Sequence, residues 1–313
     1  MKSKAFNSSS LLLAAACLAA GAFAGVPTAG AALTHNWVFV NGTLNDAVAG
    51  GPTAGLYNGA TITAGTGVNL ATGGASDSTT ASFVSLGGYV LPASGSVTVE
   101  AYFTHSGGGI GYFTNVWNFN NEASSLPGGQ TSGTDNPGAT TGQYFMNTAS
   151  EPARTIGSGQ ATPGGSAMDL ATAGYDSEQQ STNPSGSAVY LDQNGTYMVS
   201  AVLDASAGTL TYYLNGAAQV PVTLASSQTL ANFKDVNSLI GLSAFGGDPS
   251  FRNTVFTDFR IYNDALSAAQ VTADYTNGAA GVTAESTVPE PATLGAFAVG
   301  AAGLLLLRRR VRA

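Results

Sequence analysis

Cysteine, histidine and charge are all scarce in this sequence, and each scarcity excludes a class of chemistry. The only cysteine among 313 residues, Cys17, lies in an apolar N-terminal segment, so the residues after it form no disulfide and offer no catalytic thiol. His35 and His105 are the only histidines, and they do not form the H-x-x-x-H spacing of a zinc site. A Ser-His-Asp triad would need one of them, and neither lies near a Gly-x-Ser-x-Gly turn.

Basic residues are particularly rare between positions 33 and 287. This segment has four Lys or Arg and seventeen Asp or Glu side chains, which gives a net charge of −13. Proteins bind nucleic acids by neutralising phosphates with Lys and Arg, so we expect no nucleic-acid partner and repulsion from an anionic membrane surface. The acidic balance is compatible with bound divalent cations or with solubility alone.

The N-terminus has the three parts of a secretory signal. Two lysines in the first four residues precede an apolar stretch at 11–24, and A-x-A patterns follow at 22–24 and 29–31. We therefore predict a signal peptide at 1–31. Cys17 raises the alternative of a lipoprotein, but the apolar run ahead of it is very short.

The C-terminus ends in an apolar run followed by arginines. The run 292–307 would make a helix of about 24 Å at 1.5 Å per residue, against a bilayer core of about 30 Å. Arginine side chains that reach the interface would close the gap, and the positive-inside rule places the tail 308–313 in the cytoplasm. The membrane-stop residues are Arg308, Arg309 and Arg310. We predict a transmembrane sorting helix after a linker at 281–291.

The order Pro289-Glu290-Pro291, apolar helix and terminal arginine cluster resembles the PEP-CTERM sorting signal. The resemblance implies an exosortase as a partner, which would process the chain near this motif at the inner membrane. It also implies a cell-surface or extracellular destination in a Gram-negative bacterium, often in company with extracellular polysaccharide. An ordinary tail anchor is the alternative.

The middle of the chain has the pattern of an antiparallel β protein. Residues 97–103 and 197–203 alternate apolar with polar side chains, and Asn215-Gly216 gives the tight turn of a hairpin over 209–222. Further predicted strands cover 36–40, 83–86, 112–119, 143–146, 188–191, 238–242 and 254–262.

The sequence has one credible helix, and it comes late. Ser267 and Gln270 form a capping box ahead of 268–275, and Asn277-Gly278 ends the helix. We expect Leu266, Val271 and Tyr275 to dock it on the strands. Many short strands with one late helix indicate an all-β fold, a two-sheet jelly-roll sandwich.

Five stretches together are similar to laminin-G-like, concanavalin A-like jelly rolls. They are HNWVF at 35–39, LND at 44–46, VTVEAYF at 97–103, LTYYLNG at 210–216 and FTDFRIYNDALS at 256–267. The resemblance implies one domain over 32–280 with two curved antiparallel sheets, a calcium ion at the rim, and glycan or protein binding. The segment 120–186 departs from the family as a long insertion rich in Gly, Ser, Thr, Asn and Pro.

Asp46 and Asp258 are the candidate calcium ligands that the resemblance implies. Carboxylates at loop rims suit this hard cation. The alternative roles are turn capping for Asp46 and a solvated strand face for Asp258.

No strand has the alternating carboxylates that glycosidases on this scaffold carry. Glu100 stands alone, and we expect it to be structural; Asp176 and Glu178 lie in the insertion. We interpret His105 as a turn residue and His35 as preceding the first strand. The chain is therefore predicted not to be an enzyme.

Exposed aromatic side chains would be the sugar contacts. Candidates are Tyr112, Trp117, Tyr212 and Tyr213, although Trp37 and Trp117 fit a core better. We expect an exported, exosortase-sorted protein of the surface or matrix that binds extracellular polysaccharide or a surface protein. A secreted glycoside hydrolase and a structural coat protein without a specific ligand are the alternatives.

Overall fold

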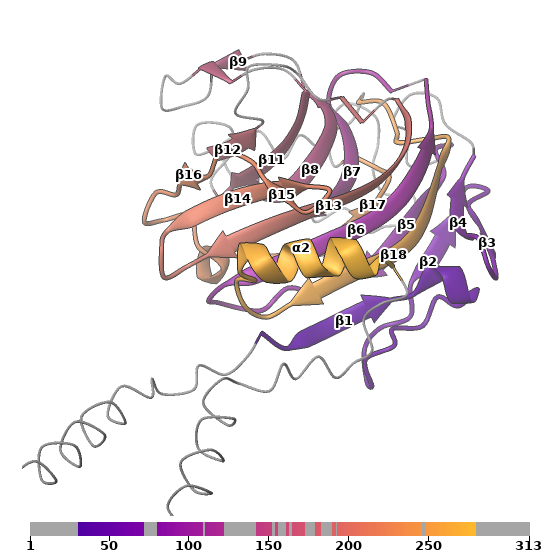
Figure 1. Cartoon of the computed structure of the whole chain (residues 1–313), viewed down its shortest axis with the longest axis horizontal. Helices are drawn as coiled ribbons and strands as arrows, with labels where there is room; N and C mark the ends of the chain where they lie inside the picture. The colour runs from indigo at the N-terminus through magenta and orange to yellow at the C-terminus, as the bar shows by residue number, and fades with distance from the viewer. Residues whose placement is uncertain are drawn as a thin grey trace, which may run out of the picture. The chain divides into compact units, whose positions relative to one another are not determined.

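Two antiparallel β-sheets pack face to face in the computed structural model (Figure 1), which confirms the predicted all-β sandwich. The described residues are 31–71, 80–108, 110–121, 142–151, 154–155, 161–162, 165–172, 179–182, 190–191, 193–243, 245 and 248–279. The predicted signal peptide, apart from its last residue, and the predicted membrane helix lie outside these ranges. Within them, no helix has both the length and the hydropathy needed to cross a membrane.

The first sheet has nine strands in the described part of the chain, in the order β15-β14-β13-β6-β18-β4-β3, with β1 on β18 and β16 on β14. Its strands are β1 (Leu33–Trp37), β3 (Thr61–Thr63), β4 (Gly67–Leu70), β6 (Val97–Ser106), β13 (Asn194–Asp204), β14 (Thr209–Leu214), β15 (Ala217–Ala218), β16 (Val222–Thr223) and β18 (Thr254–Tyr262). The long strands β13, β6 and β18 lie side by side, and β1 pairs with β18, so the first and last described strands of the fold meet in one sheet.

The second sheet has seven described strands in the order β12-β11-β8-β7-β17-β5-β2. They are β2 (Gly55–Tyr57), β5 (Phe83–Gly87), β7 (Thr114–Asn120), β8 (Tyr144–Glu151), β11 (Gly165–Ala171), β12 (Gln179–Thr182) and β17 (Asn237–Ile240). A separate pair joins β9 (Arg154–Thr155) to β10 (Ala161–Thr162). The segment 120–186, which looked like an insertion of loop composition, thus contributes β8, β11 and β12 to the sheet.

Alternating side chains from the two sheets fill the space between them. In β6, Val97, Val99 and Ala101 point into this core, and Glu100 lies on the opposite face of the same strand. The two tryptophans, Trp37 and Trp117, are fully buried, as expected for core residues. A cluster of aromatic rings surrounds them and links the sheets through Phe119, Phe145 and Phe259.

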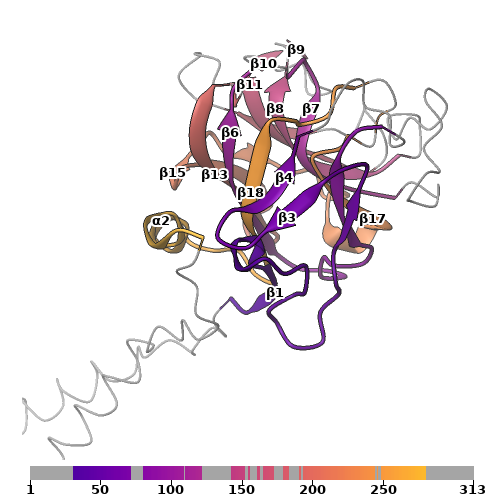
Figure 2. The same ribbon diagram turned by 90° about the vertical axis from the view of Figure 1, so that its right-hand side faces the viewer.

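The predicted hairpin and helix are both confirmed. Asn215 and Gly216 have φ values of 51° and 77°, the left-handed conformation that a primed turn requires. Helix α2 (Ala268–Asn277) starts at the Ser267–Gln270 capping box and ends at a glycine. Figure 2 shows α2 on the outer side of the nine-stranded sheet. Leu266 and Val271 are buried there, whereas Tyr275 keeps 43% of its surface exposed.

Some strand boundaries differ from the predictions because turns interrupt the polar–apolar pattern. The chain turns at Phe39–Asn41 in a 3₁₀ helix, so β1 ends at Trp37. A second short 3₁₀ helix covers Leu230–Asn232.

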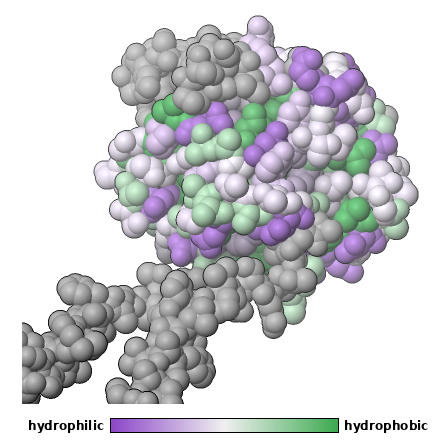
Figure 3. All heavy atoms as spheres, in the orientation of Figure 1, coloured by the Kyte–Doolittle hydropathy of each residue, from purple (hydrophilic) through white to green (hydrophobic). Residues whose placement is uncertain are grey.

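On the face that Figure 3 presents, hydrophobic residues are scattered among hydrophilic ones, so this face offers no large apolar docking surface.

Candidate functional site

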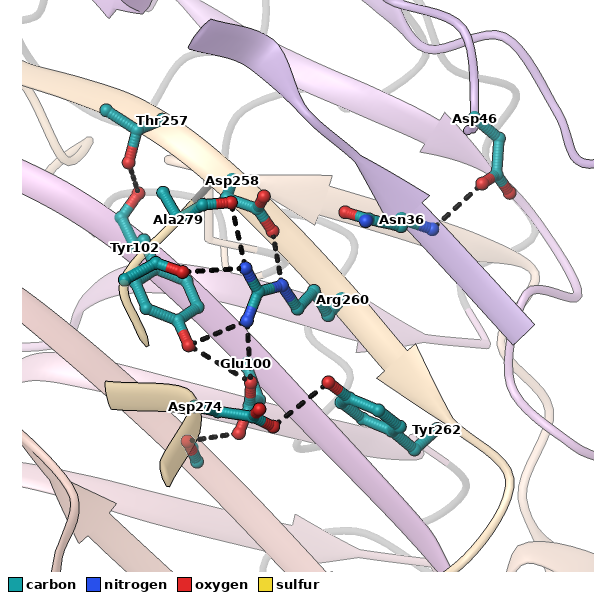
Figure 4. Close-up of polar contacts among 12 residues, drawn as sticks. Asn36, Asp46, Glu100, Tyr102, Thr257, Asp258, Arg260, Tyr262, Asp274 and Ala279 are labelled. Carbon is teal, nitrogen blue, oxygen red and sulfur yellow. Dashed lines mark hydrogen bonds and ion pairs between the residues drawn. The ribbon is translucent and has the colours of Figure 1, made fainter. Parts of the chain in front are cut away.

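Asp258, one of the predicted calcium ligands, lies in a buried charge cluster around Arg260 (Figure 4). The Arg260 Nε lies 2.9 Å from Asp258 Oδ1, and Nη1 donates to the Tyr102 hydroxyl at 2.8 Å. Glu100 Oε2 lies 3.7 Å from Nη1. The guanidinium carbon also lies 4.5 Å from the centroid of the Tyr102 ring. Asp258 is therefore an ion-pair partner, fully buried rather than on a solvated strand face.

Strand register brings these residues together. In the pairing of β18 with β6, Arg260 lies opposite Glu100 and Asp258 lies opposite Tyr102. The Arg260 Nη2 donates to the backbone carbonyls of Gly278 and Ala279, at 3.0 and 2.8 Å. One arginine thus ties the central strands to the chain just beyond α2.

Burial changes the protonation of the carboxylates in this cluster. It raises the pKa of Glu100 to about 8, with a further rise from Asp274 and an opposing effect of Arg260. Burial likewise raises the pKa of Asp258 to about 7, against the Arg260 charge. It also raises the pKa of Asp274, which accepts a hydrogen bond from Tyr262. Because several carboxylates face one guanidinium, we assign this cluster a structural role.

Asp46, the other predicted ligand, caps the loop after β1. Its Oδ1 accepts hydrogen bonds from the backbone N–H groups of Asn36 at 2.8 Å and Val48 at 2.9 Å. Its Oδ2 lies 2.6 Å from Nδ1 of His35, whose ring stacks on Trp37. These contacts match the capping alternative for Asp46. His35 itself lies within β1 rather than ahead of it.

The structure does not direct the two aspartates at a common point. Figure 4 shows Asp46 turned toward the backbone of Asn36 and Asp258 turned toward Arg260. Within the described ranges, no group of three or more His, Cys, Asp or Glu side chains could hold a metal ion. The calcium site therefore stays a prediction.

The other residues weighed for catalysis are also engaged in the fold. His105 belongs to β6 instead of the following turn, and its Nδ1 lies 2.8 Å from the Thr254 hydroxyl. Its ring stacks on Phe251 in the interior. Asp176 and Glu178 lie outside the described residues.

Of the four aromatic candidates for sugar contact, only Tyr112 reaches the surface. Trp117 and Tyr212 are in the core, where the Tyr212 hydroxyl lies 2.8 Å from Ser166 Oγ. Tyr213 is buried on the other face of its strand, near α2. Tyr112 is 58% exposed.

Tyr112 and Phe113 form an aromatic tip in the turn between β6 and β7. Phe113 is 38% exposed and has φ of 67°, a conformation that costs a bulky residue of order 1–3 kcal/mol. Its N–H donates to the Ser150 carbonyl at 2.6 Å, which fixes the tip to the end of β8. In the described ranges, four other non-glycine residues have positive φ, and apart from Tyr89 they are asparagines, which tolerate it.

A half-buried carboxylate, which the sequence analysis missed, lies in the loop beside the tip. Asp248 Oδ2 accepts a hydrogen bond from Ser243 at 2.7 Å, and burial raises the pKa of Asp248 to about 6. The next residue, Pro249, packs on Gly111: a Cβ on that glycine would lie 2.8 Å from Pro249 Cγ. A Gly-Gly-Asp-Pro sequence is typical of a turn, so nothing local marked Asp248 as functional.

A chain of buried amides, also missed, lies on the outer face of the seven-stranded sheet. Asn118 donates to Asn115 at 2.7 Å, Asn120 to Asn118 at 2.9 Å, and Asn237 to Asn120 at 3.3 Å. The N-V-W-N-F-N pattern of β7 could have indicated it. Because these amides hydrogen-bond to one another, we assign them a structural role, which is to join β17 to β7.

Residues 287–310 match the model of the PEP-CTERM protein-sorting motif. The chain therefore carries this sorting signal, as its Pro289-Glu290-Pro291 run and arginine cluster predicted. The signal implies export and membrane-anchored sorting in Gram-negative bacteria. Its residues lie outside those that the structure describes. No curated protein matches the chain.

Among solved structures, domain 4 of AbnA, an extracellular GH43 arabinanase from Geobacillus stearothermophilus, solved with arabinotriose, is similar to this chain. The TM-score is 0.51 at 14% identity, over 78% of this chain and 98% of that domain. The CBM40 of the Ruminococcus gnavus IT-sialidase, bound to α2,6-sialyllactose, gives a TM-score of 0.43 at 14% identity over 66% of this chain and 95% of that one. The first likeness shows a shared sandwich fold, and the laminin-G-like assignment in particular stays a prediction.

Proposed function

We propose that this is a non-catalytic exported protein that binds glycans outside the cell through one end of its sandwich. The aromatic tip is the observation that carries the proposal. Its Tyr112 ring is exposed, and the hydrogen bond from the Phe113 N–H to Ser150 holds the tip in place despite the unfavourable backbone conformation at Phe113. Aromatic rings beside a few polar groups are the usual lining of ligand sites, and their apolar faces suit the C–H faces of sugars.

Two further observations support glycan binding. The arabinanase domain with the same fold was solved with a trisaccharide bound. The sorting motif implies export, and a place outside the cell would give the domain access to extracellular polysaccharide. The destination that we propose is the cell surface or the matrix, after processing by an exosortase.

The engagement of the carboxylates supports a non-catalytic role. Glycoside hydrolysis needs two carboxyl groups facing each other across the sugar, about 5–10 Å apart. Glu100 and Asp258 instead share Arg260 in a buried cluster, and Asp46 is paired with His35. Each of these acids already has a structural task.

Affinity gel electrophoresis of the full chain tests the proposal. The gels contain arabinan, dextran, xylan or alginate. We expect at least one polymer to retard the protein, and Tyr112→Ala to weaken the retardation. Tyr275→Ala is the matched control, since that tyrosine is 43% exposed on α2. Release of reducing sugar would contradict the non-catalytic role, and equal migration in every gel would favour a coat protein without a ligand.

A further inference from the structure

We infer that the aromatic tip and Asp248 together bind an uncharged polysaccharide. A sugar ring stacks on Tyr112, and hydroxyl groups of the same chain donate hydrogen bonds to the Asp248 carboxylate. This inference rests on the proposed function and adds the chemical class of the glycan and its polar contact.

The two parts of the site lie on adjoining loops. Pro249 packs directly on Gly111, so the neighbours of these two residues along the chain lie at the same end of the sandwich. Asp248 adjoins Pro249, and Tyr112 adjoins Gly111. The Asp248 N–H also bonds the carbonyl of Phe245, which keeps the loop turned back on itself.

Asp248 has capacity left for a ligand. Ser243 donates to Oδ2, and within the described residues no hydrogen bond reaches Oδ1. Nor does any described cation form an ion pair with this carboxylate. A carboxylate oxygen accepts strong, short hydrogen bonds from hydroxyl groups, and sugars present these in adjacent pairs.

Charge decides between uncharged and acidic glycans. A uronate or sulfate group on the ligand would meet the like charge of Asp248 at close range. Beyond this contact, the segment 33–287 has a net charge of −13, which repels polyanions at low salt. Arg252, the nearest basic residue in sequence, already takes part in another interaction.

Affinity electrophoresis of the full chain at low and high salt tests the inference. Arabinan and dextran are the uncharged probes, and alginate is the acidic probe. We expect retardation by an uncharged polymer that changes little with salt, and none by alginate at low salt. Tyr112→Ala and Asp248→Asn should each weaken binding about tenfold.

Two variants serve as matched controls. Tyr89 is an exposed tyrosine with positive φ in another loop, and Asp204 is an aspartate at the end of β13 that accepts a hydrogen bond from Ser206. Tyr89→Ala and Asp204→Asn should bind as the wild type does, and melting temperatures check that all variants fold. Binding to an uncharged polymer that survives both Tyr112→Ala and Asp248→Asn overturns the inference but leaves glycan binding intact, as does a preference for alginate. A wild type that no polymer retards overturns the proposed function itself.

Discussion

Alkaline pH should weaken the fold through Glu100. The side chain is fully buried, and its pKa rises from 4.5 to about 8 in the folded state. The folded protein therefore holds a proton that the unfolded chain releases between these two pH values. It follows that the contribution of Glu100 to stability is complete below pH 4.5 and is lost as the pH rises through about 8.

The size of the effect follows from the shift. One pKa unit corresponds to about 1.4 kcal/mol, so a shift of roughly 3.5 units gives a loss of at most about 5 kcal/mol between acidic and alkaline pH. Domains are stable by only about 5–15 kcal/mol, so this loss would be large. Glu100→Gln keeps a neutral side chain of the same shape, and it should lack this part of the decline.

Urea unfolding at pH 5 to 9 measures both proteins. The wild type should lose stability steadily above pH 5, and Glu100→Gln should fall less, so that the variant becomes the more stable protein near pH 9. Asp204→Asn is the control, because Asp204 is only partly buried and its pKa is lowered, chiefly by the Ser206 hydroxyl. Parallel curves for the wild type and Glu100→Gln would refute the reasoning, as would a wild type equally stable at pH 5 and 9.

Further substitutions test the core, the charge cluster and the metal prediction. Arg260→Met should lower the free energy of unfolding by about 3–5 kcal/mol at pH 8, because it leaves the buried Asp258 carboxylate, whose pKa is about 7, without its cation; a loss under 1 kcal/mol in urea unfolding would contradict this. Trp117→Ala removes a fully buried ring and should cost about 3–5 kcal/mol in the same assay. Gly67→Ala should destabilise far more than Gly208→Ala, because its Cβ would lie 2.2 Å from a backbone oxygen while Gly208 faces open space; equal melting temperatures would count against it. The calcium prediction requires a binding heat and a rise in melting temperature that Asp46→Asn removes, so identical melting in calcium and in EDTA would refute it.

Local sequence signals predicted the parts of the fold that depend on neighbouring residues. The turn at Asn215-Gly216 needs only positive φ, and the helix start at Ser267 needs only its own first turn. Period-two alternation likewise located β6 and β13. Each of these features is determined within a few residues, so the sequence contains the whole reason for it.

The candidate site depends on contacts between distant parts of the chain. Arg260 meets Tyr102 across 158 positions, so no spacing in the sequence indicated that Asp258 would be an ion-pair partner. The place of Asp248 beside the aromatic tip depends on how Pro249 packs on Gly111. Of the four aromatic residues expected to contact sugar, only Tyr112 is exposed. Whether an aromatic side chain is exposed depends on where its strand ends, and the sequence pattern did not locate the strand ends.

The hydrogen bonds from Arg260 to Gly278 and Ala279 have a consequence for maturation of the protein. These are the last described anchors of the chain, and the sorting motif begins at residue 287. A cut near Pro289-Glu290-Pro291 would therefore remove no residue that the described fold uses. Losing the tail should leave the melting temperature of the domain unchanged, so release from the membrane and integrity of the sandwich are independent events.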